Sequence, residues 1–152
     1  MIDLRALPVN RVGSAGELGN LVRKAAASDQ VVYPRGGGTM LDFGMPATKP
    51  GAAVDLTALD QVIDYPARDM TITVQAGITI SRLQEILAQE NQRVPIDVPS
   101  PDRATLGGAI ACNVSGPRRY GFGTFRDYVI GISVVNDRGE EIKAGGRVVK
   151  RG

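Results

Sequence analysis

Pro34-Arg35-Gly36-Gly37-Gly38-Thr39 is the stretch of the 152-residue chain on which the prediction of its fold depends. It follows Val31-Val32-Tyr33, a short run typical of a β-strand, which the proline is expected to end. Three successive glycines remove every Cβ from the turn, so the backbone N–H groups can converge on an anion such as phosphate. Arg35 adds a positive charge and Thr39 a hydroxyl donor. A plain flexible turn explains the glycines equally well, so the loop alone leaves both interpretations open.

Two familiar phosphate-binding loops do not match this segment. The dinucleotide fingerprint needs a helix directly after its glycines, whereas residues 40–50 contain Gly44, Pro46 and Pro50. A Walker loop needs Gly-Lys-Ser/Thr, whereas Gly38 is followed by Thr39-Met40. Phosphate binding here is therefore expected to occur without a helix dipole behind the loop.

A second glycine-containing segment spans residues 104–116 and is rich in small side chains. It predicts a short helix near residues 106–111 that lies flat against a partner, either another element of the protein or an extended ligand. Close helix packing explains the small residues but not the donors Asn113 and Ser115 beside them. Cys112, which lies between small apolar neighbours, is expected to be buried.

Composition indicates one folded domain, with 43% hydrophobic and 22% charged residues. The longest apolar runs are too short to span a membrane, the start lacks a secretory signal pattern, and one cysteine fits a reducing cytoplasm. A net charge of +2 gives no reason to expect a nucleic-acid partner. The chain contains no histidine, the commonest general base and metal ligand, so we predict no metal site and no catalytic residue in it.

The periodicity of apolar residues predicts an α+β fold without regular βαβ alternation. One helix begins at a capping box formed by Ser14 and Glu17 and continues through Ala27, and a second is capped by Thr79 or Ser81. The expected strands are 31–33, 52–56, 62–65, 71–75 and a buried strand at 128–135, which the turn at 136–139 joins to a hairpin partner at 140–143.

The two glycine segments, taken together and in this order, resemble a known family. The chain is similar to the FAD-binding domain of the vanillyl-alcohol oxidase and p-cresol methylhydroxylase type (PCMH-type), and within it most similar to the FAD-binding subunit of bacterial glycolate oxidase. The match runs from about Val31 to the last residue. The residues that carry it are 34–39, 54–56, 74–77, 99–101, 105–108, 113–121 and 127–131.

This resemblance implies two α+β subdomains with FAD between them. The first, about residues 1–58, would hold a small parallel sheet. The second, about 59–152, would hold a larger mixed or antiparallel sheet, and the flavin domain is expected to be C-terminally truncated. The loop at 36–39 would hold the pyrophosphate. The implied cofactor-binding residues are Pro34, Arg35, Gly36, Gly37, Gly38, Thr39, Ser100, Pro101, Thr105, Gly108, Asn113, Ser115, Gly121 and Ile132.

The resemblance also implies an FAD-dependent oxidoreductase, a flavoprotein acting on glycolate or another 2-hydroxy acid. Many relatives attach FAD through a histidine, so in this chain the FAD is expected to be non-covalent. Other subunits of an oxidase complex are the expected partners, and the chain alone is expected to be inactive. We expect a cytoplasmic protein, associated with a membrane only through such partners.

Two alternatives stay open on the sequence. One is a nucleic-acid-binding module that uses the interleaved basic and aromatic residues of 118–126, against which the net charge and the 5% aromatic content argue. The other is a structural remnant that keeps the fold but binds nothing. The residues of the proposed basic-aromatic platform are Arg118, Arg119, Tyr120, Phe122, Phe125 and Arg126.

Overall fold

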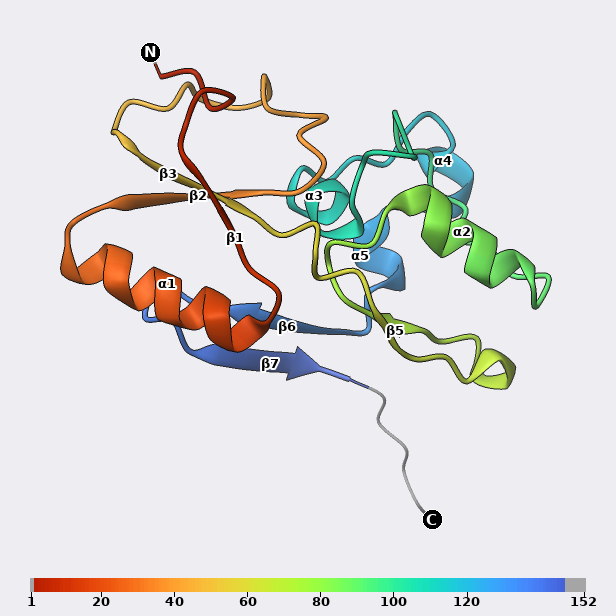
Figure 1. Ribbon diagram of the computed structural model, residues 1–152. Coiled ribbons are helices and arrows are strands. Elements are labelled where there is room, and N and C mark those ends of the chain that lie inside the picture. The colour runs from red at the N-terminus through yellow and green to blue at the C-terminus, as the bar shows by residue number, and fades with distance from the viewer. Residues whose placement is uncertain (1, 147–152) are drawn as a thin grey trace.

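The structure is a computed structural model that describes residues 2–146, and within them a small parallel sheet lies beside a helical half (Figure 1). An antiparallel hairpin follows at the end of the described chain. The elements are β1 (Val9–Arg11), α1 (Ala15–Ala27), β2 (Val31–Arg35), β3 (Gly51–Asp55), β4 (Val62–Asp64), the 3₁₀ turn η1 (Ala67–Asp69), β5 (Thr73–Val74), α2 (Ile80–Ala88), α3 (Leu106–Ala111), α4 (Arg119–Phe122), α5 (Phe125–Tyr128), β6 (Gly131–Val135) and β7 (Glu141–Gly145).

The parallel sheet has the strand order β1-β3-β2, and α1 covers one of its faces. Leu18 and Leu21 of α1 pack into the cluster around Val54, which is fully buried at the centre of β3. The helix begins at the predicted cap: the Ser14 hydroxyl accepts a hydrogen bond from the Glu17 amide at 3.1 Å. Strand β2 continues through Pro34 instead of ending there. Because β2 is an edge strand, a residue without an N–H is tolerated in it.

The helical half has its core between α2, α3 and α5. Ile80 of α2 is buried with Ala109 of α3 and Phe125 of α5. Thr79 caps α2, as one of the two predicted caps, since its hydroxyl accepts from the Arg82 amide at 3.3 Å. This core places the first turn of α3 against the glycine loop of the parallel-sheet half.

The strand predicted at 128–135 forms over Gly131–Val135 and pairs with its predicted hairpin partner, but the prediction that it is buried is wrong. Strand β6 pairs only with β7 among the described residues, and Ile132, Val134 and Ile142 are 45%, 43% and 46% exposed. Val134 lies opposite Ile142 in the register, so these side chains share one uncovered face. The run looked like a buried strand because it is almost entirely apolar, but no described element covers that face.

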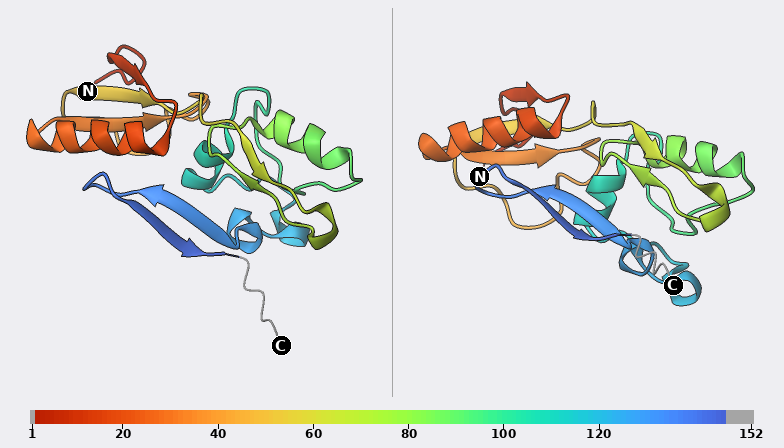
Figure 2. Two further views of the ribbon diagram at one scale, coloured as in Figure 1. Left: turned by 60° about the horizontal axis from the view of Figure 1, so that its bottom comes forward. Right: turned by 90° about the horizontal axis from the view of Figure 1, so that it is seen from below.

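The tip of this hairpin docks on α1 (Figure 2). The turn forms as predicted, with the Gly139 amide donating to the Asn136 carbonyl at 3.0 Å. Gly139 has a φ of +72°, and a Cβ on it would lie 2.3 Å from the carbonyl oxygen of Gly19. Arg23 then donates to the Gly139 carbonyl at 2.7 Å. The hairpin is thus fixed at its turn, while its strands lie at the surface.

Candidate functional site

The two glycine segments face each other across a cleft of about 190 Å³. Strand β2 and the loop after it form one wall, and α3 with the residues before it forms the other. The lining of the cleft also includes four apolar side chains, those of Leu4, Met40, Leu41 and Phe43. The predicted site residues that line the cleft are Pro34, Arg35, Gly36, Gly37, Gly38, Thr39, Thr105 and Gly108.

Close contact between the two walls explains two of the three glycines. A Cβ on Gly36 would lie 2.1 Å from the Thr105 hydroxyl oxygen, and one on Gly37 would lie 1.7 Å from the Arg103 carbonyl oxygen. Only Gly38, with a φ of +66°, has the left-handed conformation that favours glycine. Gly37 is constrained instead by the close approach of the Arg103 backbone.

The glycine loop has free hydrogen-bond donors. The backbone N–H groups of residues 36–39 donate to no acceptor within residues 2–146. In α3, by contrast, the amides of Leu106 and Gly107 donate to the carbonyls of Ile78 and Ala76 at 2.9 and 2.8 Å, and that of Gly108 donates to the Thr105 hydroxyl at 3.3 Å. Because partly buried donors need acceptors, the loop and not α3 is the place where an anion would bind.

Electrostatics at the end of the parallel sheet also favour an anion. Arg11, Asp55 and Arg35 lie in register across the ends of the three strands. Burial by itself would raise the pKa of Asp55, but hydrogen bonds from Thr57 and the charges of Arg11 and Arg35 outweigh burial and hold it below its usual value. Arg11 forms an ion pair with the Asp55 carboxylate, with its Nε 3.5 Å from Oδ2 of Asp55. Arg35 lines the cleft and forms no ion pair within the described chain, so its charge is available to a ligand.

The other predicted site residues lie outside this cleft, and their cofactor contacts stay predictions. Ser100 and Pro101 form an exposed turn, in which the Ser100 carbonyl accepts from the amides of Arg103 and Ala104. Asn113 is exposed beyond the end of α3, and Ser115 is buried with its hydroxyl 3.4 Å from the Asn113 carbonyl. Gly121 of α4 and Ile132 of β6 are exposed on more distant elements.

The expectation that Cys112 is buried is wrong. Its side chain is exposed and lines the cleft at the C-terminal end of α3. Helix α3 ends at Ala111 and Cys112 is its C-cap residue, so the thiol lies just beyond the helix and not on the face that packs against the core. The apolar residues of the cleft between positions 40 and 43 were not predicted from the sequence. They lie in a stretch that contains glycine and proline and shows no periodic spacing of apolar residues.

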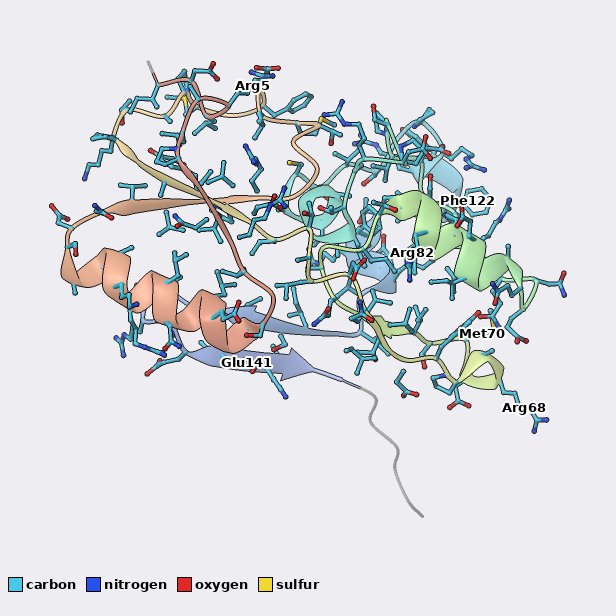
Figure 3. The ribbon with its side chains drawn as sticks, in the orientation of Figure 1. Arg5, Arg68, Met70, Arg82, Phe122 and Glu141 are labelled. Atoms are coloured by element: carbon cyan, nitrogen blue, oxygen red, sulfur yellow. The ribbon has the colours of Figure 1, made fainter. Side chains whose placement is uncertain are left out.

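The structure brings only part of the predicted basic-aromatic platform to the surface. Phe125 is 4% exposed and belongs to the core. The Arg118 guanidinium binds the Asp97 carboxylate through Nε at 2.7 Å and also through Nη2. Phe122 (Figure 3) lies under the guanidinium groups of Arg93 and Arg118, 5.8 and 6.0 Å from its ring centre. Two of the six predicted platform residues, Phe125 and Arg118, are thus used by the fold itself.

The fold and the cleft together fit the class of domain that binds an anionic cofactor. The chain belongs to the FAD-binding domain family, whose pattern it matches over residues 7–145. FAD is therefore the cofactor that this family implies, and the free loop amides, Arg35 and the small residues of α3 fit a phosphate-containing ligand.

Among curated relatives, the chain is 33% identical over 138 residues to D-2-hydroxyglutarate dehydrogenase of Xanthomonas citri pv. viticola, covering 91% of this chain and 29% of that protein. It is 28% identical to glycolate oxidase subunit GlcE of Escherichia coli, covering 85% and 37%, and 33% identical to subunit GlcD of Bacillus subtilis, covering 78% and 25%. The chain thus spans between a quarter and two fifths of the length of these relatives. These comparisons confirm the predicted family.

A solved structure of alkyldihydroxyacetonephosphate synthase superposes with a TM-score of 0.76 at 24% identity, covering 91% of this chain and 28% of that one. This likeness confirms the predicted fold.

Within residues 2–146, no helix is long and apolar enough to cross a membrane, and no group of three or more His, Cys, Asp or Glu residues could hold a metal ion.

Proposed function

We propose that this chain is the FAD-binding part of an oxidoreductase that acts on a 2-hydroxy acid, glycolate being the first candidate. The names of the relatives support the substrate class, since D-2-hydroxyglutarate, glycolate and D-lactate all carry a hydroxyl beside a carboxylate. The names of two relatives, both subunits of glycolate oxidase, support the proposal that further subunits are its partners.

The observation that carries the proposal is the row of free amides at residues 36–39. In the proposed complex these N–H groups and Arg35 bind the pyrophosphate of FAD, and Thr39 adds its hydroxyl. The segment Thr105–Gly116 offers the flavin side a surface of small side chains, against which a flat ring can lie. The cleft of about 190 Å³ is smaller than a typical ligand pocket of about 300–1,000 Å³, so it accounts for part of the cofactor only.

The chemistry divides between cofactor and protein. FAD, when bound, supplies the acceptor for the two electrons that leave a hydroxy acid. The chain contains no histidine, the commonest general base, so we propose that its own residues bind and orient the cofactor and that a residue outside this chain is the base for the substrate hydroxyl. The chain has no histidine to attach FAD, so we propose that the cofactor is held non-covalently and that the exposed Cys112 forms no bond with it.

Titration of the purified chain with FAD, followed by flavin fluorescence, tests this proposal. Arg35→Ala should weaken FAD binding by about 10- to 100-fold, because a hydrogen bond to a charged group contributes about 1.5–3 kcal/mol. Arg119→Ala, a change on the exposed side of α4 outside the cleft, should leave the affinity unchanged. A wild-type chain that binds no FAD would identify a structural remnant, and equal affinities in the two variants would remove Arg35 from the site.

Acid precipitation of the FAD-loaded chain tests the non-covalent link. All of the flavin is expected in the supernatant. Cys112 is the one side chain of the cleft that could form a thioether, so Cys112→Ser is the matched control. Flavin that stays with the wild-type polypeptide but is released from Cys112→Ser would contradict non-covalent binding.

A further inference from the structure

Phe43 is an exposed aromatic side chain in the wall of the cleft. Its side chain lines the same cleft as the glycine loop, yet the residue is 69% exposed, so little of the protein covers its ring. An uncovered aromatic ring beside a row of free amides is a surface on which a flat ligand group can stack.

The segment that carries Phe43 is held in place. Arg5 (Figure 3) donates to both carboxylate oxygens of Asp42, at 3.0 and 2.7 Å. The Phe43 amide donates to the Met40 carbonyl at 3.1 Å, and the Ile2 amide donates to the Ala47 carbonyl at 3.0 Å. The N-terminal segment thus fixes the loop on both sides of Phe43. A ring positioned in advance loses less freedom when a ligand binds to it.

The position of Phe43 relative to the glycine loop indicates which group it would contact. The lining of the cleft includes the glycine loop, residues of α3 and, from the chain segments before β1 and after the loop, Leu4, Met40 and Phe43. FAD carries a flat ring system on each side of its pyrophosphate. With the pyrophosphate at residues 36–39 and the flavin toward residues 105–116, as the proposed function has it, the adenosine end extends toward Phe43.

We propose that Phe43 is the stacking platform for the adenine ring of the bound dinucleotide, and that the Arg5–Asp42 ion pair positions it. This inference rests on the proposed FAD site and adds to it a residue that sets specificity for the base. Stacking of a base on an aromatic side chain predicts an effect of about tenfold or more in affinity when the ring is removed.

Isothermal titration calorimetry of the full chain with ADP, inorganic pyrophosphate, FMN and FAD tests the inference. Phe43→Ala should weaken ADP and FAD binding about tenfold or more and leave the affinities for pyrophosphate and FMN unchanged. Phe43→Trp should keep or improve ADP binding. Met45→Ala is the matched control, because Met45 is 93% exposed on the same loop but does not line the cleft.

The outcomes separate this inference from the proposed function. Unchanged ADP affinity in Phe43→Ala, with FAD still bound, would overturn the adenine platform alone. Weaker FMN binding without weaker ADP binding would also overturn it, because the flavin ring would then lie on this side. A wild-type chain that binds neither pyrophosphate nor FAD would overturn both the platform and the proposed function.

Discussion

Replacement of Gly37 by alanine should separate the two walls of the cleft. The new Cβ would lie 1.7 Å from the carbonyl oxygen of Arg103 and 2.6 Å from its carbonyl carbon, whereas real Cβ contacts stay above 3.0 Å. Both groups are backbone, so the walls must move apart by more than an ångström. Forcing an extra methyl into a packed contact costs about 2 kcal/mol, which lowers the Tm of a domain of this size by about 4–8 °C.

Gly38→Ala is the matched control for this change. A Cβ on Gly38 would meet only the Leu41 side chain, at 3.6 Å, so its cost comes from the φ of +66° alone. That cost is about 1 kcal/mol, or about 2–4 °C in Tm. Thermal unfolding of both variants without ligand, followed by circular dichroism, measures the difference. A Gly37→Ala variant as stable as Gly38→Ala, or more so, would refute the close contact between residues 37 and 103.

Two further results are expected. The pKa of Asp55 is held below its usual value, so its contribution to stability should be fully present above about pH 4 and should be lost as the pH falls through its folded-state pKa. Asp55→Asn should therefore have a lower free energy of unfolding in urea than wild type at pH 7. A difference in unfolding free energy between the two proteins that does not become smaller below about pH 4 would contradict this. The FAD-loaded 152-residue chain should not oxidise glycolate or D-lactate with an artificial electron acceptor, because it contains no histidine and a positioned base contributes about 10²–10⁴-fold; steady-state turnover would show that another residue of this chain is the base.

The glycine segments could be predicted from the sequence because each has a backbone requirement that few residues meet. Three glycines after a strand, and a short helix of small residues, already indicated two surfaces that need close approach. The structure adds the partner of each: Gly36 meets Thr105, and Gly37 meets Arg103. These contacts join residues more than 60 positions apart, and no local pattern specifies which distant segment a glycine faces.

Exposure was harder to predict than position. Cys112 and the strand predicted at 128–135 were expected to be buried because their neighbours are apolar, but Cys112 is exposed and Ile132 and Val134 of β6 are 45% and 43% exposed. Local hydrophobicity shows that a segment can be covered, but only the tertiary arrangement decides whether anything covers it. Phe43 was not predicted as a site residue, because a single aromatic residue in a loop without periodicity forms no sequence pattern.

The uncovered hairpin bears on how copies of this polypeptide associate in solution. Strands β6 and β7 pair only with each other in the described chain, so each has a row of N–H and C=O groups that can pair with another strand. One face of this ribbon carries Ile132, Val134 and Ile142, while Glu141 and Lys143 lie on the opposite face. An unpaired, β-branched edge without charges on its apolar side is a template for growth by strand addition. We therefore expect that concentrated solutions of the chain form intermolecular sheets that start at the free edges of this hairpin.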